Sequence, residues 1–369
     1  MSQAPRKRDA LRGGMRRAIV SLGTVLPPGQ PRWPIALQAA IVLVVPVLIG
    51  ISVGRMDLGL IAATGAFTVP YFAALPRLER LRLRPLAGLG LVLTSVFGAV
   101  LAPYPIASAV GLAIVAVGIG YTVHGYRLGP PGPLFPILVY GLSGHAVAGG
   151  MSPVVLVSTV AAGCTWAVVA SLAPLIRREH WQITPRPLRV LLAQPVWDRG
   201  AKELMARTAI VAVGATVISV AFLDAERAYW AVAAGVVVVG VVPGRGLAVT
   251  RGLHRTVGTI AGIGVYYGIV NLSMAPVLLA LTLGVLQFIT ELAITRHYAI
   301  AVTAVTPMAL VIVTAGSGTF GSAAVMGERM LDTVVGAGLA VATALLHPAA
   351  PADPTGRHGP VHHLPGPSR

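Results

Sequence analysis

The sequence predicts an all-α membrane protein of about twelve transmembrane helices, arranged as two six-helix repeats of the same orientation (a 6+6 pseudo-dimer). Hydrophobic residues make up 55% of the 369 residues and charged residues 11%, whereas a soluble protein carries about 25% charged residues. Two sets of apolar segments superimpose without a gap at an offset of 171 residues. This offset pairs Arg80 with Arg251, Arg84 with Arg255, Pro105 with Pro276 and Pro136 with Pro307.

Twelve apolar segments, separated by short polar breaks, are the predicted spans. A spanning helix needs about 20 apolar residues, so twelve of them leave room for loops, a linker and two tails but not for a sizeable soluble domain. In the first repeat, residues 33–176, the predicted spans are 35–53, 58–75, 86–102, 106–123, 134–149 and 153–176. In the second repeat, residues 206–347, they are 207–223, 229–242, 256–271, 274–292, 297–315 and 329–346.

Three polar segments flank and join the repeats. Residues 1–32 form a basic tail, residues 177–205 a charged linker, and residues 348–369 a tail rich in Pro, Gly and His that we expect to be disordered. The first apolar run starts near Ile35 and continues as a full span. The sequence therefore predicts a signal-anchor helix that stays in the protein, with no cleavable signal peptide.

The distribution of basic residues predicts the orientation. With a cytoplasmic N-terminus, 25 of the 28 Lys and Arg residues lie inside, and only Arg55, Arg227 and Arg329 lie outside. Both termini and the linker are therefore expected to be cytoplasmic, in the bacterial cytoplasmic (inner) membrane. Because each repeat has an even number of spans, a pseudo-two-fold axis along the membrane normal should relate them.

Several function classes are disfavoured. The net charge of +16 does not indicate a nucleic-acid partner, because the charges gather on one side of the spans and form no groove-reading face with interleaved aromatics. Arginine outnumbers lysine 26 to 2, which is typical of GC-rich coding. The sequence lacks H-E-x-x-H, G-x-S-x-G, C-x-x-C and phosphate-loop motifs and has one cysteine, Cys164. We therefore expect no enzyme, no cofactor and no metal site.

The fifth span of each repeat is the first candidate substrate path. The first repeat has Tyr126 and Arg127, then three prolines and two glycines in succession at 129–133, and Pro136. Such a segment cannot be α-helix, and broken backbone at membrane depth is tolerated only against protein or a water-filled cavity. Tyr126–Pro133 could equally be a plain cytoplasmic loop. The matching span of the second repeat carries Tyr298, Thr303, Thr306 and Pro307.

Ionisable residues near span ends are the second group of candidates. Carboxylates at membrane depth are costly and commonly mark ion pathways or proton relays, which makes Asp332 and Glu291 candidates for proton coupling. The alternative is that acidic residues cap a helix start, where they favour the positive end of the dipole. For Glu328, which shares a face with Asp332, capping is the preferred interpretation.

Arg84 and Arg255 recur at the cytoplasmic starts of the third and ninth spans. A guanidinium binds a carboxylate through two hydrogen bonds, so such a pair would attract anions, although positive-inside anchoring also explains arginines there. Tyr229 and Trp230 open the eighth span at its outer end. They fit either an aromatic belt at the membrane interface or a surface on which an aromatic solute stacks.

Four motifs together resemble the fusaric-acid-resistance-like family of aromatic-acid exporters. They are Arg227-Ala228-Tyr229-Trp230-Ala231, Arg255-Thr256-Val257-Gly258-Thr259, His297-Tyr298-Ala299, and Arg329-Met330-Leu331-Asp332-Thr333 followed by Gly336. The resemblance is clearest over 207–346. It implies export of aromatic carboxylates or related compounds driven by the proton gradient, and related plant proteins form anion channels from paired six-helix units. Larger members carry a substantial cytoplasmic domain, whereas this chain has only the linker 177–205.

The leading hypothesis is a proton-coupled inner-membrane exporter of small organic, mainly aromatic, anions. Arg84 and Arg255 would gather the anion, the fifth and eleventh spans would form its path, and Asp332 or Glu291 would carry the proton. A voltage-driven anion channel is the first alternative. A non-transporting membrane scaffold that recruits partners through its basic segments is the second. The expected partners are the lipid bilayer and a small organic anion, and assembly into a homo-oligomer stays open.

Overall fold

The computed structural model describes residues 7–27, 31–173, 185–314 and 319–346, which contain helices and connecting turns but no strand. Over these residues the all-α prediction is confirmed. The predicted disordered tail, 348–369, lies outside the described residues, as do parts of the predicted basic tail and of the predicted linker.

The helices of the first half follow the predicted apolar segments. They are α2 (Trp33–Ser52), α3 (Met56–Ala62) continued by the 3-10 helix η1 (Ala63–Thr68), α4 (Arg77–Leu101), α5 (Pro105–Gly125), α6 (Leu134–Ala148) and α7 (Pro153–Ala170). Proline begins α5 and α7, where its missing N–H costs no hydrogen bond. The segment between α5 and α6 is not helical, as its prolines predict.

The second half begins after a short helix α8 (Leu188–Leu191). It contains α9 (Arg199–Phe222), the 3-10 helix η4 (Ala225–Arg227), α10 (Ala228–Val239), α11 (Arg245–Asn271), α12 (Pro276–Ala293), α13 (Tyr298–Thr314) and α14 (Ala323–Leu346). An additional helix, α1 (Lys7–Ser21), lies within the segment predicted as a basic tail and packs against α11.

Six of the described helices are long and apolar enough to cross a membrane: α2, α4, α5, α7, α9 and α12. The predicted spans at 58–75, 134–149 and 297–315 correspond to shorter apolar helices. The predicted span 229–242 corresponds to α10, whose 12 residues reach only about 18 Å. The protein is thus a multi-pass helical membrane protein, and twelve full-length spans remain a prediction.

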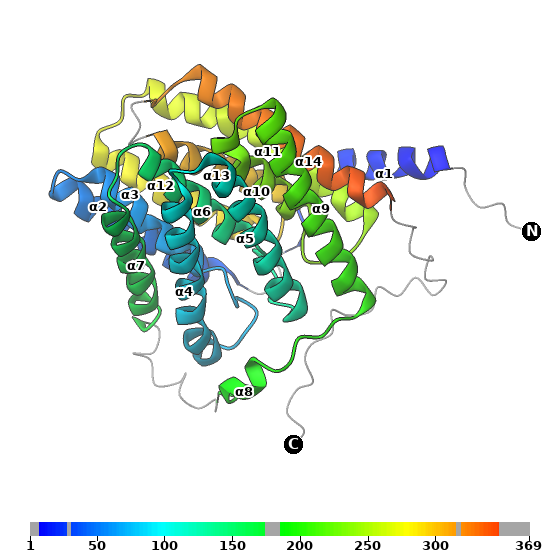
Figure 1. Ribbon diagram of the computed structural model, residues 1–369, viewed down its shortest axis with the longest axis horizontal. Helices are drawn as coiled ribbons and strands as arrows, with labels where there is room; N and C mark the ends of the chain where they lie inside the picture. The colour runs from blue at the N-terminus through cyan, green and yellow to red at the C-terminus, as the bar shows by residue number, and fades with distance from the viewer. Residues whose placement is uncertain (1–6, 28–30, 174–184, 315–318, 347–369) are drawn as a thin grey trace, which may run out of the picture.

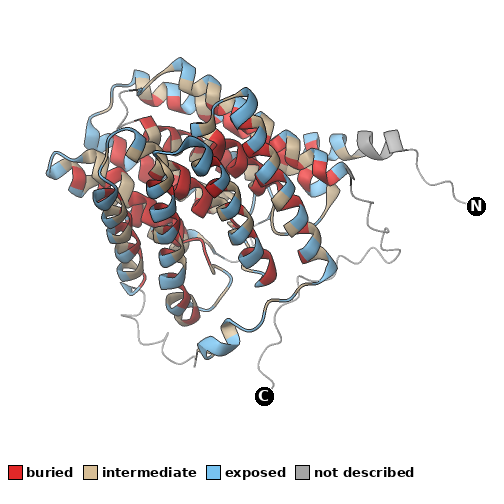
Figure 2. Cartoon of the chain, viewed as in Figure 1, coloured by how far each residue is buried: buried red, intermediate tan, exposed pale blue. Residues whose placement is uncertain are grey.

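The short helices need not span the lipid, because they lie inside the protein. Figure 1 shows α4, α5, α7 and α9 side by side, with α6 and α10 behind them. All residues of α10 except Val237 are buried, which is the pattern of a helix enclosed by others. The outer helices instead expose large apolar side chains, as Leu89, Leu93 and Phe97 of α4 do, and Figure 2 shows this contrast.

Helix packing interlocks the two halves. The first helix of each half packs on the fourth helix of the other, α2 on α12 and α9 on α5. Within the halves, α4 packs on α6 and α7, and α11 packs on α13 and α14. The helix pairs of one half therefore have counterparts in the other.

At one end of the helix bundle, arginine side chains bind the segments that connect the helices. We define the basic end as the end where α2, α4, α9, α11 and α13 begin and where α5 and α12 end. There the linker's Arg186 donates from Nε and Nη2 to the Glu79 carboxylate at 2.8 and 2.7 Å. These hydrogen bonds raise the pKa of Arg186 above its ordinary value and tie the linker to α4.

Glycines allow the closest helix crossings. A Cβ atom at Gly336 of α14 would lie 2.0 Å from the Ala231 carbonyl oxygen of α10, and one at Gly163 of α7 would lie 1.9 Å from the Ala62 carbonyl oxygen at the end of α3. Small residues at such crossings let helix backbones approach in membranes. The position of α14 against α10 therefore depends on Gly336.

We expect Gly336→Ala to destabilise the protein by about 1–3 kcal/mol, because the added methyl group forces α10 and α14 apart. Gly338→Ala, two residues along the same helix, is the control, since a Cβ atom there meets nothing within 4 Å. It should be neutral or stabilising by up to about 1 kcal/mol through helix propensity. Thermal unfolding in detergent measures both variants. Equal midpoints would contradict the crossing argument.

Candidate functional site

Buried cationic side chains gather where α10, α11, α13 and α14 meet. Arg255 of α11 and Arg329 of α14 are each 3% exposed, and their charges lie close enough to repel one another. Arg251 lies one turn before Arg255, and the Tyr298 hydroxyl of α13 interacts electrostatically with both Arg251 and Arg329. We call Arg251, Arg255, Arg329 and Tyr298 the buried arginine cluster.

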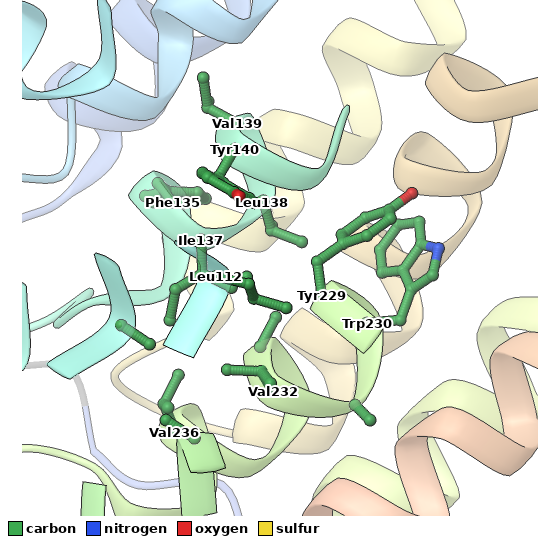
Figure 3. Close-up of a cluster of buried hydrophobic side chains, with 14 of the residues drawn as sticks. Leu112, Phe135, Ile137, Leu138, Val139, Tyr140, Tyr229, Trp230, Val232 and Val236 are labelled. Atoms are coloured by element: carbon green, nitrogen blue, oxygen red, sulfur yellow. The ribbon is translucent and has the colours of Figure 1, made fainter. Parts of the chain in front are cut away.

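Arg329 is held by aromatic side chains. Its guanidinium carbon lies 3.9 Å from the centroid of the Trp230 ring, a distance typical of a cation–π contact. The Tyr229 ring lies beside Trp230, with centroids 4.9 Å apart, and Figure 3 shows the two side chains adjacent at the start of α10. Trp230 thus stabilises the arginine without using its N–H groups.

Several polar atoms of the cluster lack hydrogen bonds within the described part of the chain. They are Nε and Nη1 of Arg329, Nε of Arg255, Nη1 of Arg251 and the Tyr298 hydroxyl, and all are buried. A buried polar group without a partner costs about 1–3 kcal/mol, and most such groups in native proteins are paired. The cluster therefore presents unused donors to whatever occupies the space between its helices.

Asp332 provides a carboxylate beside the cluster, and it is 1% exposed. Neither carboxylate oxygen accepts a hydrogen bond from a described residue. The nearest ion pair is to Arg227, whose Nη1 lies 3.8 Å from Asp332 Oδ2. Arg227 is shared with Glu328, at 3.1 Å, and Asp224, at 3.3 Å. Asp332 is therefore only weakly paired within the described residues.

Tyr229 separates the cluster from a cleft at the opposite end of the bundle. The cleft has a volume of about 40 Å³ and is lined by α5, α6 and η4 residues and by Tyr229, which is space for no more than a few waters. A Cβ atom at Gly141 of α6 would lie within 2.4 Å of three Tyr229 ring atoms. The ring thus fills the gap between α6 and α10, with the cleft on one side.

Tyr229 and Trp230 are 3% and 6% exposed, respectively. The aromatic-belt interpretation predicted both side chains on the lipid-facing surface, and this interpretation is wrong. They are buried because α6 and α14 cover the start of α10. A stacking surface for an aromatic solute stays a prediction.

Arg84, the counterpart of Arg255, lies in a different environment. It is 1% exposed and donates to the Ser171 hydroxyl and, at 3.2 Å, to the Val69 carbonyl oxygen. Among the described contacts, none joins Arg84 to Arg255. The structure thus gives the Nη1 and Nη2 groups of Arg84 protein partners, although its Nε atom, like that of Arg255, has no partner among the described residues.

Tyr126 and Arg127 follow the end of α5, which is not one of the helices that carry the buried arginine cluster. Arg127 Nη2 forms an ion pair with Asp198 Oδ2 at 2.6 Å, and both side chains are more than half exposed. Asp198 also caps α9 by accepting from the Ala201 N–H at 2.7 Å. The Tyr126–Pro133 turn therefore fastens the end of α5 to the start of α9, which fits the alternative of a loop at the basic end.

Glu291 forms a buried ion pair. Its Oε2 lies 3.3 Å from Arg32 Nη2, Arg32 Nε donates to its carbonyl oxygen at 3.2 Å, and Gln287 donates to Oε1 at 3.4 Å. The residue joins α12 to the start of α2. Its carboxylate oxygens accept hydrogen bonds from described residues, whereas those of Asp332 accept none.

The prolines and threonines of the fifth spans take different positions. Pro136 lies in the first turn of α6, where it breaks no hydrogen bond. Pro307 lies inside α13 and removes the donor for the Thr303 carbonyl oxygen. That oxygen and the Thr306 side chain face Gly262 of α11. Thr306 and Pro307 thus shape the contact between α11 and α13 about two helical turns beyond Tyr298.

Sequence reasoning missed two members of this site. Arg251 was noticed only as the repeat partner of Arg80, although its four-residue spacing from Arg255 places both on one helix face. Arg329 is predicted at the outer start of the twelfth span and counts there only as an outside basic residue, although an arginine within an apolar segment marks a functional position by default.

Residues 211–343 match the family described as fusaric acid resistance protein-like. This stretch contains Tyr229, Trp230, Arg251, Arg255, Tyr298, Arg329 and Asp332, so the whole candidate site falls within it. No curated protein and no solved structure matches the chain.

We expect Tyr229 to be the barrier between the cleft and the cluster. In a Cys164→Ala background, a cysteine at Asp332 should react slowly with an impermeant thiol reagent and about tenfold faster after Tyr229→Ala, because the ring no longer fills the gap. A cysteine at Ala148, which lines the cleft, should react at the same rate in both. Tyr229→Phe should keep the slow rate. Unchanged labelling of Asp332→Cys in Tyr229→Ala would disprove the barrier.

Proposed function

Because residues 211–343 form a fusaric acid resistance protein-like domain, we propose that this protein exports small organic anions, aromatic carboxylates among them, across the bacterial cytoplasmic membrane. The observation that carries the proposal is the set of buried, unpaired N–H and O–H donors of Arg251, Arg255, Arg329 and Tyr298. The family supports a membrane transport or resistance role. The unpaired donors support a solute that carries a negative charge.

A carboxylate fits these donors better than a cation or a neutral solute does. Guanidinium groups bind carboxylates through paired, charge-assisted hydrogen bonds, and a bound anion would offset the repulsion between Arg255 and Arg329. A cation would add to that repulsion. A neutral solute would leave three guanidinium charges buried against one carboxylate, Asp332. An organic anion thus supplies both the charge and the acceptors.

The path in this proposal runs among α10, α11, α13 and α14 of the second half and reaches the first half where Tyr229 lies against Gly141 of α6. Reciprocal packing of α2 on α12 and of α9 on α5, together with the Arg and Pro pairs at the 171-residue offset, supports a 6+6 repeat. Both termini would be cytoplasmic, with the basic end inside. An anion would then enter near Arg251, pass Arg255 and Arg329, and leave past Tyr229.

Proton coupling in this proposal belongs to Asp332 rather than Glu291. Asp332 has no hydrogen-bond donor among the described residues, whereas Glu291 is paired with Arg32. A protonated Asp332 would no longer compete with the substrate for the arginines. Export of an anion is also downhill by about 2.3 kcal/mol per charge per 100 mV. A voltage-driven channel is therefore the second candidate, and the two differ in their response to a pH gradient.

Efflux from proteoliposomes loaded with a panel of aromatic carboxylates tests the function, with voltage and pH gradient imposed separately. Arg255→Gln and Arg329→Gln should each lower efflux by about tenfold or more, because one lost charge-assisted hydrogen bond is worth about 1.5–3 kcal/mol. Arg199→Gln, an exposed arginine at the basic end, should leave efflux unchanged. Wild-type protein that moves no anion under either gradient contradicts the proposal and favours the scaffold.

Asp332→Asn distinguishes the exporter from the channel. In a proton-coupled exporter, the variant should lose the flux that follows the pH gradient and keep the flux that follows voltage, because an amide carries no proton across. In a channel, both fluxes should equal those of the wild type. Thermal unfolding in detergent checks that the variant is folded.

A further inference from the structure

Two stacked histidines hold the N-terminal segment against the basic end. The rings of His254 in α11 and His297, just before α13, lie 5.1 Å apart at an interplanar angle of 25°. His254 Nε2 lies 2.8 Å from the Ser21 hydroxyl, and His297 Nε2 lies 2.9 Å from the Leu22 carbonyl oxygen. We call residues 18–26 the N-terminal strap.

Backbone hydrogen bonds extend this attachment. The Leu26 N–H donates to the Arg296 carbonyl oxygen at 3.0 Å, and Arg296 Nε donates back to the Leu26 carbonyl oxygen at 3.4 Å. Ala18 is fully buried, and α1 packs against α11. The strap therefore crosses from α11 to the turn between α12 and α13.

The hydrogen bonds define the protonation state of both rings. His254 Nδ1 accepts from the Ala299 N–H, and His297 Nδ1 accepts from the Ile300 N–H, each at 3.3 Å. A ring nitrogen that accepts carries no proton, so each neutral ring has its proton on Nε2. The Ser21 hydroxyl donates to the Ala18 carbonyl oxygen, which leaves its lone pairs for His254. The Leu22 carbonyl oxygen can only accept, which fits His297 as donor.

A second proton on either ring would break this arrangement. It would place an N–H at Nδ1 directly against a backbone N–H, and two stacked imidazolium rings would repel one another. A cation at His297 would also oppose the positive end of the α13 dipole. Histidine is the side chain whose charge changes between about pH 5 and 8.

The charged groups around the two rings are arginines. Arg251 and Arg255 flank His254 on α11, Arg296 and Tyr298 flank His297, and α1 contributes the exposed Arg16 and Arg17. Within the described chain, neither ring forms an ion pair with a carboxylate. A proton added to either ring would therefore meet positive neighbours and no carboxylate, and it would favour release of the strap.

The strap is held by residues that are next in the sequence to two members of the buried arginine cluster. His254 immediately precedes Arg255, and His297 immediately precedes Tyr298, so each residue that holds the strap is adjacent to a member of the cluster. We propose that residues 18–26 form a lid over the basic-end mouth of the cluster, which acidification on that side releases. The anion passing beneath the lid rests on the proposed function, but the release itself does not.

Cysteine labelling tests the lid in the purified full-length chain. In a Cys164→Ala background, Ala18→Cys should react slowly at about pH 7.5 and about tenfold faster at about pH 5.5, relative to the exposed control Gly23→Cys at each pH. The ratio removes the pH dependence of the thiol itself. Labelling that is independent of pH after this correction overturns the proposal.

Variants of the two histidines test whether they cause the acid-induced labelling. His254→Gln with His297→Gln keeps neutral hydrogen-bonding side chains and should abolish the acid-induced labelling of Ala18→Cys. His145→Gln, at the opposite end of the bundle, should leave it intact. Persistence of the acid response in the double variant would show that other groups release the strap.

Efflux measurements connect the lid to transport. Acidifying the basic-end side of proteoliposomes should raise efflux of an aromatic carboxylate in the wild type but not in His254→Gln/His297→Gln. Faster labelling without a change in efflux, from protein that does transport, overturns the lid role. Absence of any efflux contradicts the proposed function instead, and the labelling result still decides whether acid releases the strap.

Discussion

The burial of arginine side chains without matching acceptors is the constraint that organises this protein. Arg255 and Arg329 are almost fully buried and repel one another, and lipid offers a guanidinium neither water nor a counter-charge. Such groups persist only where surrounding helices keep lipid away from them. The enclosed helix α10 supplies the Trp230 ring, α11 and α14 supply the arginines, and α13 supplies Tyr298. The long outer helices then supply the apolar surface that faces lipid.

The sequence was sufficient to predict the helical segments, because hydropathy and proline positions act locally. Pro105 and Pro276 begin α5 and α12, and the run from Tyr126 to Pro133 is not helical. Helix lengths were harder to predict, because a helix such as α10 that is covered by protein need not match the lipid thickness. The convergence of Arg251, Arg255, Tyr298 and Arg329 depends on three helices from separate parts of the chain. No local pattern specifies that convergence.

The two halves have the same helix pairings but different polar chemistry. Arg84 donates to the Ser171 hydroxyl and to the Val69 carbonyl oxygen from its two Nη groups, and its Nε atom has no partner among the described residues. Arg255 instead lies within electrostatic range of Arg329, whose position in the first half is held by Ser158 at the 171-residue offset. The duplicated scaffold thus carries one candidate site, in the second half. The first half contributes Gly141 of α6, against which the Tyr229 ring packs.

Both ends of the proposed path are closed in this structure, and the closures differ in physical kind. At the cleft end the closure is steric, because the Tyr229 ring fills the space above Gly141. At the basic end it is a set of hydrogen bonds from neutral His254 and His297 to the strap. A steric closure responds to movement of α6 against α10, whereas a hydrogen-bonded closure responds to protons. In the proposed mechanism each closure has its own trigger, so that one end would open while the other stays shut, which is the condition that alternating access imposes on a transporter.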